Sequence, residues 1–161
     1  MTLLQRSDGD DYSSGVSYLD LAELIIQSGH QVERDLEELW RRIVFFICIS
    51  NTDDHLRNHV FLLTRQGWRL APAYDVNPTP HGNGLHLNIS ETDNSQDLDL
   101  ALKVAPYFRV KHTQALEIVK DSVSVVANWR TVAKSLGIGR DEQERMASAF
   151  DHAHYGTTVS K

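Results

Sequence analysis

The stretch LEELWRRIVFFICI, from Leu36 to Ile49, decides how the rest of the chain is interpreted. Its apolar residues recur at three- and four-residue steps, which predicts a helix that begins near Arg34-Asp35. From Ile43 onward the stretch is apolar almost all round, so we expect this helix to lie in the middle of the core. Cys48, the single cysteine of the chain, falls within that run and is expected to be a small core residue.

The segments around this helix predict a mainly α fold with one small β-hairpin. Upstream, Ser17 begins a helix that ends at Gly29, and Asp20 lies where its side chain can complete a capping box with Ser17. Downstream, two short apolar strands flank Arg65-Gln66-Gly67, which is typical of a hairpin with glycine at its turn. Three further helices are expected, at Leu98 to Val104, at roughly Gln114 to Leu136, and at Arg140 to about Ala153.

The chain is expected to form one domain, because 161 residues with 41% hydrophobic content can bury one sizeable core. Residues 1–16 are rich in Ser, Asp and Gly and predict a flexible or irregular start. Residues 17–153 would form the folded lobe, and residues 154–161 a flexible tail. The tryptophans are expected in or near the core; they are Trp40, Trp68 and Trp129.

The charge balance argues against one broad class of partner. A formal net charge of −6 disfavours a general phosphate-backbone binder, which displays a clustered basic surface, so we expect no direct nucleic-acid binding. No stretch approaches the ~18 apolar residues of a membrane span, and the first residues lack the pattern of a signal peptide. We therefore expect a cytoplasmic protein with no membrane association.

A polar segment, Asn51-Thr52-Asp53-Asp54-His55-Leu56-Arg57-Asn58, follows the apolar helix without a break. A rigid helix that leads into a polar loop holds side chains at fixed distances, as catalysis requires. Asp53 and Asn58 show the spacing of a protein-kinase catalytic loop, in which the Asp accepts the substrate hydroxyl proton and the Asn holds magnesium. The spacing alone also arises by chance in loops.

A second candidate element is Leu70-Ala71-Pro72-Ala73-Tyr74-Asp75-Val76, where a strand end presents one carboxylate across the hairpin from Asn58. Mg²⁺ prefers oxygen ligands and usually takes one or two carboxylates together with phosphates and waters. Asn58 and Asp75 would serve as its ligands, which leaves Asp53 available to orient and deprotonate a hydroxyl. No glycine follows Asp75, unlike in familiar protein kinases, so the match is one of topology and role.

The histidines and acids near this loop allow other interpretations. Asp54 is favoured as a residue that caps or turns the loop rather than one that acts in chemistry. His55 and His59 together with Asp53 would suggest zinc, but this spacing lacks the remaining ligands of a closed site. His86 has no recognisable partner spacing and is expected on the surface or in a loop.

Two stretches together carry a family resemblance: Asn-Thr-Asp-Asp-His-Leu-Arg-Asn at 51–58, and Gly-Trp-Arg-Leu-Ala-Pro-Ala-Tyr-Asp-Val-Asn-Pro at 67–78. They resemble the signature of HipA-type serine/threonine kinases, the toxin component of bacterial toxin–antitoxin modules. The similarity extends upstream through residues 17–22 and downstream to about Phe150, and it implies the helical C-terminal lobe of that family.

The resemblance also implies a role for individual residues of this chain. Asp53 resembles the catalytic aspartate, and Asn58 and Asp75 resemble the magnesium ligands. His55 and Arg57 fall where the family's loop has a His and a basic residue, which implies that they orient the loop or contact phosphate. ATP and Mg²⁺ are therefore the implied substrate and cofactor.

The chain departs from the family at its N-terminal side. HipA-type kinases have an N-terminal lobe with a phosphate-binding loop and a nucleotide-contacting lysine, whereas the first lysine here is Lys103 and no Gly-rich loop precedes Asp53. We therefore expect a truncated kinase lobe that needs a missing N-lobe polypeptide for phosphoryl transfer from ATP to a protein substrate. The alternative is a non-catalytic binding or regulatory module of a toxin–antitoxin system, packed against an antitoxin-like helix-turn-helix protein. Whether the chain acts as an enzyme stays open at this point.

Overall fold

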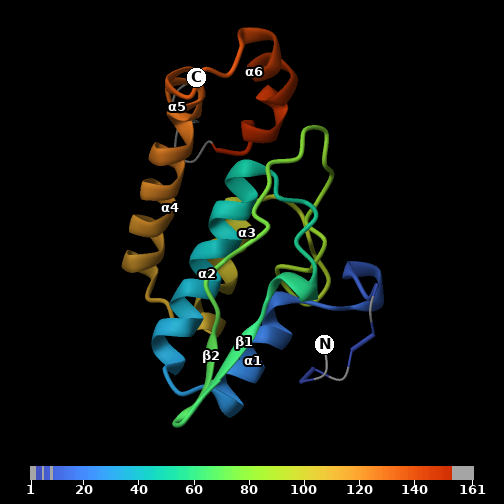
Figure 1. Ribbon diagram of the computed structural model, residues 1–161. Coiled ribbons are helices and arrows are strands. Elements are labelled where there is room, and N and C mark those ends of the chain that lie inside the picture. The colour runs from blue at the N-terminus through green and yellow to red at the C-terminus, as the bar shows by residue number, and fades with distance from the viewer. Residues whose placement is uncertain (1–2, 5, 8, 154–161) are drawn as a thin grey trace.

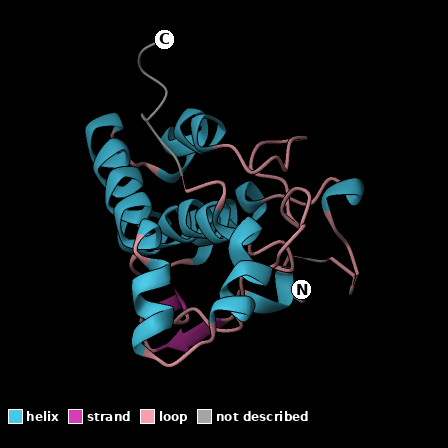
Figure 2. Ribbon diagram, turned by 90° about the horizontal axis from the view of Figure 1, so that it is seen from above, coloured by secondary structure: helices cyan, strands magenta, loops and turns pink. Residues whose placement is uncertain are grey.

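The central helix α2, Val32–Ile49, runs through the middle of the computed structural model, which describes residues 3–4, 6–7 and 9–153 (Figure 1). Helices α1, Tyr18–Ser28, α3, Leu98–Val104, and α4, His112–Ala127, all contact it. Seen from above, the strands of the hairpin lie at one edge of the group of helices (Figure 2). The expectation of a mainly α fold with one small hairpin is therefore confirmed.

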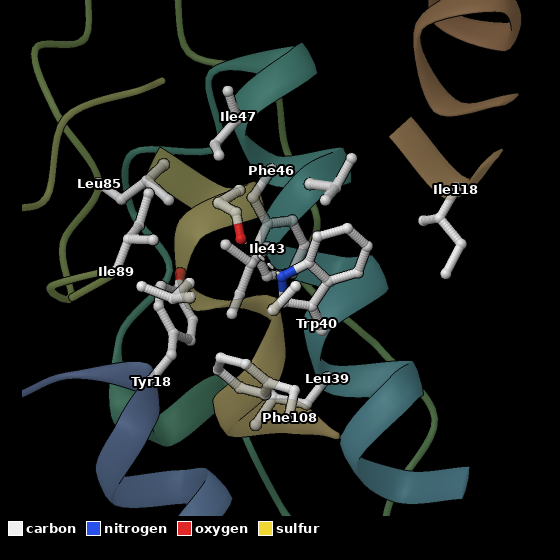
Figure 3. Packing of buried hydrophobic residues seen from close by; sticks show 14 of the residues in the cluster. Tyr18, Leu39, Trp40, Ile43, Phe46, Ile47, Leu85, Ile89, Phe108 and Ile118 are labelled. Carbon is white, nitrogen blue, oxygen red and sulfur yellow. Dashed lines mark hydrogen bonds between the residues drawn. The ribbon is translucent and has the colours of Figure 1, made fainter. Parts of the chain in front are cut away.

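The core gathers around α2, as the apolar pattern predicts. Trp40, Ile43, Ile47 and Cys48 are completely buried, and Phe108 packs beside them (Figure 3). The indole nitrogen of Trp40 donates to the carbonyl of Ala101 at 3.0 Å, so this large ring is buried without an unsatisfied donor. Burial raises the pKa of the Cys48 thiol to about 12, which is consistent with a core residue.

Helix α1 begins and ends where its sequence signals place it. The backbone N–H of Ser17 donates to Asp20 Oδ2 at 3.2 Å, and the N–H of Gly29 closes the last turn on the carbonyl of Ile25 at 2.8 Å. Just upstream, Tyr12–Ser14 forms a 3₁₀ turn, and Val16 is fully buried. The tail expected at residues 154–161 lies outside the described residues.

The hairpin pairs β1, Phe61–Thr64, with β2, Gly67–Leu70, in an antiparallel register that sets Phe61 opposite Leu70. Gly67 has φ of 135°, a conformation that favours glycine at the turn as predicted. The β2 strand is tied to α2, because the Leu70 N–H donates to the buried carboxylate of Asp35 at 2.9 Å. The hairpin is therefore fixed to the central helix.

The prediction of a single helix from about Gln114 to Leu136 is wrong. The chain instead forms α4 and then α5, Trp129–Ser135, with a break at Asn128, whose ψ of 6° leaves the helical region. The Asn128 side-chain amide donates to the Ser124 carbonyl at 2.8 Å, and the Trp129 and Phe150 rings stack with their centroids 4.3 Å apart. Both contacts turn the chain at this point.

The last predicted helix is shorter than expected. Helix α6 spans Arg140–Met146 and is followed by a 3₁₀ turn at Ala147–Phe150, not by α-helix up to Ala153. A further 3₁₀ turn, Ala105–Phe108, follows α3. Within the described part of the chain, no helix is both long and apolar enough to cross a membrane.

Candidate functional site

The polar loop after α2 begins with a sharp change of chain direction at Ser50. This residue takes a left-handed conformation with φ of 50°, and the next N–H, of Asn51, returns to the carbonyl of Phe46 at 2.9 Å. The following residues then form a short 3₁₀ turn, Leu56–Asn58, that leads into β1. The buried helix thus delivers a compact loop whose backbone is held at both ends.

His55 lies between two of the predicted site residues. Its Nδ1 is 2.8 Å from Asn58 Oδ1, and its Nε2 is 3.0 Å from Asp53 Oδ1. The Asp53 side chain is 76% exposed, whereas Asn58 is buried. His55 therefore joins an open carboxylate to an amide at the bottom of the loop.

The proton arrangement of His55 decides which of these contacts is a hydrogen bond. The ring donates to both Asp53 and Asn58 only when both nitrogens carry a proton. With a proton on Nδ1 alone, it still donates to Asn58, and Nε2 can accept from the Arg57 guanidinium, which lies 3.5 Å away. His55 can thus link the loop in more than one way.

The hairpin brings Asp75 back to this loop. Asn58 Nδ2 donates to Asp75 Oδ2 at 3.2 Å, and Asn77 Nδ2 donates to Asp75 Oδ1 at 2.8 Å. Asp75 is exposed and has φ of 55°, a left-handed conformation that aspartate tolerates better than most residues. The neighbouring Tyr74 hydroxyl donates to the backbone carbonyl of Arg57. Asn58 and Asp75 therefore flank the hairpin in sequence and meet in space.

The arrangement brings all five predicted site residues together: Asp53, His55, Arg57, Asn58 and Asp75. A chain of contacts links them, from Asp53 through His55 to Asn58 and on to Asp75, with the Arg57 guanidinium beside His55. Oxygen ligands of this type suit Mg²⁺, which needs only one or two protein ligands when phosphates and waters complete its shell. The geometry is thus consistent with the residue set, while the role of each residue stays a prediction.

His86 is a neighbour of this site that sequence reasoning did not connect to it. Its ring packs edge-on against His55, with centroids 4.9 Å apart. Burial lowers the pKa of His86, and the nearby His55 lowers it further. This contact joins two distant segments of the chain, so the local sequence around His86 gives no signal of it.

Asp54 and His59 face away from the site, into the protein. Asp54 accepts hydrogen bonds at 2.7 Å from both the Tyr18 hydroxyl and His59 Nε2. Asp54 was expected to cap or turn the loop, but its carboxylate bonds two side chains instead, one of them in α1, which local sequence could not indicate. In the part of the chain that the structure describes, no three His, Cys, Asp or Glu side chains are arranged to hold a metal ion.

Comparison with known proteins identifies a matching family and individual relatives. A family model described as the HipA-like C-terminal domain matches residues 1–154. A Haemophilus influenzae protein named "Putative kinase" is 36% identical over 76 residues, which are 45% of this chain and 22% of that protein.

Among solved structures, this chain resembles one in the complex of HipA, HipB and operator DNA of a Shewanella oneidensis MR-1 toxin–antitoxin system. The TM-score is 0.62 at 17% identity, with 86% of this chain and 34% of that chain covered. The present chain thus spans about a third of the structural relative and about a fifth of the curated one. Because the family model covers nearly the whole sequence, this chain belongs to the family of HipA-like C-terminal domains.

Proposed function

We propose that this chain is the catalytic C-terminal lobe of a serine/threonine protein kinase and supports Mg²⁺-dependent phosphoryl transfer from ATP to a protein hydroxyl. One observation carries the proposal: Asn58 Nδ2 donates to Oδ2 of Asp75, which follows the hairpin, at 3.2 Å, and His55 contacts both Asn58 and Asp53. Protein kinases need a metal-binding Asp, a metal-binding Asn and a catalytic-loop Asp in one place.

Asn58 and Asp75 would hold the magnesium ion. Asp75 offers an exposed carboxylate, and Asn58 offers an amide oxygen at the bottom of the loop, provided that the amide turns this oxygen from His55 toward Asp75. When bound, the ion would neutralise charge on the phosphates of the nucleotide. The predicted ligand set fits the preference of Mg²⁺ for hard oxygen donors.

Asp53 would act as the base that orients and deprotonates the substrate hydroxyl. Its side chain is 76% exposed, so a hydroxyl from another protein can reach it, and His55 restrains its position at 3.0 Å. Arg57 lies on the same loop, and its cationic group suits contact with phosphate oxygens. These roles divide the five residues into metal ligands, base and positioning groups.

The remaining parts of the machinery are proposed to lie outside the residues of this lobe. A kinase N-lobe would supply the nucleotide-contacting lysine and the phosphate loop. An antitoxin-like helix-turn-helix protein is the proposed regulatory partner, since the similar Shewanella structure contains HipA together with HipB. The protein whose hydroxyl is phosphorylated would bind on the side of the loop where Asp53 is exposed.

A titration of the purified chain with ATP and Mg²⁺ tests the proposal. The wild type should bind the complex, and Asp75→Ala should weaken binding by about tenfold or more, because it removes the one carboxylate placed beside Asn58. Asp141→Ala, which removes an exposed carboxylate from α6, is the matched control and should bind like the wild type. Equal binding by wild type and Asp75→Ala, or none by either, would favour the non-catalytic module.

A further inference from the structure

The loop between α2 and β1 pairs each of two proposed site residues with a neighbour that is turned inward. Asp54 follows Asp53, and His59 follows Asn58. The side chain of Asp53 is 76% exposed, whereas those of Asp54 and His59 are 2% and 1% exposed. The proposed function uses Asp53 and Asn58 but assigns nothing to the inward pair.

The inward residues bond to each other across the base of the loop. His59 Nε2 lies 2.7 Å from Asp54 Oδ2, and the Tyr18 hydroxyl reaches the same carboxylate at 2.7 Å. His59 Nδ1 is buried and has no hydrogen-bond partner among the described residues. A proton on that nitrogen would be an unsatisfied buried donor, so the ring is expected to carry its proton on Nε2, which then donates to Asp54.

This bond joins two points of the backbone that are adjacent to the proposed base and to a proposed metal ligand. We propose that Asp54, His59 and Tyr18 form a buried clamp that fixes Asp53 and Asn58 relative to each other, as positioning residues for phosphoryl transfer. The inference rests on the proposed function, because it assigns to the clamp an effect on that same site. Residues that orient metal ligands through hydrogen bonds commonly change metal affinity when they are replaced.

Tyr18 extends the clamp beyond the loop. It is the first residue of α1, and its backbone N–H donates to the carbonyl of Asn88 at 2.9 Å. The segment that contains Asn88 also contains His86, which packs against His55. Burial and the charge of Asp54 raise the pKa of the Tyr18 hydroxyl well above its usual value, so it keeps its proton and remains a donor. The clamp therefore ties together three segments that surround the site.

A purely structural bond would stabilise the fold without affecting the site, so the test must separate these two effects. His59→Leu removes the donor and keeps a side chain of similar bulk, whereas His59→Gln keeps an N–H donor near the position of Nε2. Tyr18→Phe removes only one hydroxyl and serves as a milder variant where His59→Leu does not fold. Val119→Ala, in the buried face of α4, lowers stability at a residue outside the loop and is the matched control.

Each variant is measured in three ways: melting temperature, affinity for Mg²⁺ in the presence of ATP, and hydrogen exchange of the Asn58 amide. In the wild type that amide donates to the carbonyl of His55 at 2.9 Å, so its exchange reports order within the loop. We expect His59→Leu to weaken Mg²⁺ binding by about tenfold and to accelerate exchange at Asn58. His59→Gln should restore most of the Mg²⁺ affinity and most of the slow exchange at Asn58. Tyr18→Phe should change the affinity and the exchange less than His59→Leu does. Val119→Ala should change only the melting temperature.

The proposal of a clamp is overturned if His59→Leu and Tyr18→Phe have lower melting temperatures but keep the Mg²⁺ affinity and the Asn58 exchange rate of the wild type. Failure of the proposed function has a different signature, which is equal Mg²⁺ binding by the wild type and Asp75→Ala. In that case exchange at Asn58 decides alone: greater acceleration in His59→Leu than in Val119→Ala supports the clamp, and equal acceleration rejects it.

Discussion

Trp40 and Trp129 show how differently two regions of this molecule are held together. Trp40 belongs to the site-bearing region, formed by α1, α2 and the hairpin, where it is completely buried and its indole nitrogen is bonded. Trp129 belongs to the C-terminal region, formed by α4 to α6 (Figure 1). There it is only half-buried and contacts the Phe150 ring and the Arg130 guanidinium. The same residue type thus anchors a core in one region and covers a surface in the other.

The two regions also differ in what fixes their geometry. Buried polar groups join the elements of the site-bearing region. The Asp35 carboxylate accepts from an N–H of β2, and the Asp54 carboxylate accepts from a hydroxyl of α1. The Arg42 guanidinium donates to the Ala71 carbonyl at 2.7 Å. The C-terminal region instead meets the end of α2 at an open, apolar hollow of about 350 Å³, with Leu136 73% exposed at its edge. Directional bonds specify positions closely, whereas apolar contacts specify them less, so the precise chemistry lies where buried hydrogen bonds are found.

The largest predicted effect comes from exchanging the two tryptophans for alanine. Trp40→Ala should lower the free energy of unfolding by about 4 kcal/mol, since it leaves a large cavity and removes the hydrogen bond to the Ala101 carbonyl. Trp129→Ala should cost about 1 kcal/mol, because that ring is half-buried and its contacts are a stacking pair and a cation. Urea unfolding followed by circular dichroism measures both, and equal losses would contradict the contrast between the regions.

A smaller effect is predicted for Asp35, which holds the hairpin to the central helix. Asp35→Ala should lower the free energy of unfolding by about 2 kcal/mol, because the Leu70 N–H then lacks its buried acceptor. Asp35→Asn retains an acceptor oxygen and should recover most of the loss, which makes it the matched control. Chemical denaturation of the two variants measures the difference. If both behave like the wild type, a directional bond is not what fixes the hairpin.

The elements that could be predicted from the sequence are those specified by neighbouring residues. Helix α2 follows from an apolar run buried on nearly every side, α1 from Ser17, Asp20 and Gly29, and the turn from Gly67. The proximity of Asp53, Asn58 and Asp75 was predictable for a related reason, since the first two lie on one short loop and the hairpin returns the chain to them. Local pattern and loop length carry this information together.

The features that could not be predicted depend on contacts between distant segments. The residues before and after Asn128 continue a helical apolar pattern, so nothing local indicates that Trp129 will stack on Phe150 and help turn the chain. Tyr18 and Asp54 are separated by 36 residues, and only the packing of α1 against α2 brings them together. His86 reaches His55 for the same reason, through a segment that pairs with residues before α1.

The smallest predicted effect sharpens the comparison at the exposed edge of the apolar hollow. Leu136→Ser removes a side chain that is 73% exposed, so little apolar surface is lost from the folded state, and the free energy of unfolding should change by less than about 0.5 kcal/mol. Urea unfolding measures this change, and sedimentation at several protein concentrations follows self-association in the same samples. A loss above about 1 kcal/mol that grows with protein concentration would mean that a second copy covers Leu136 in solution. The C-terminal region would then be an interface buried between two chains, and its weak packing within one chain would be completed by the other.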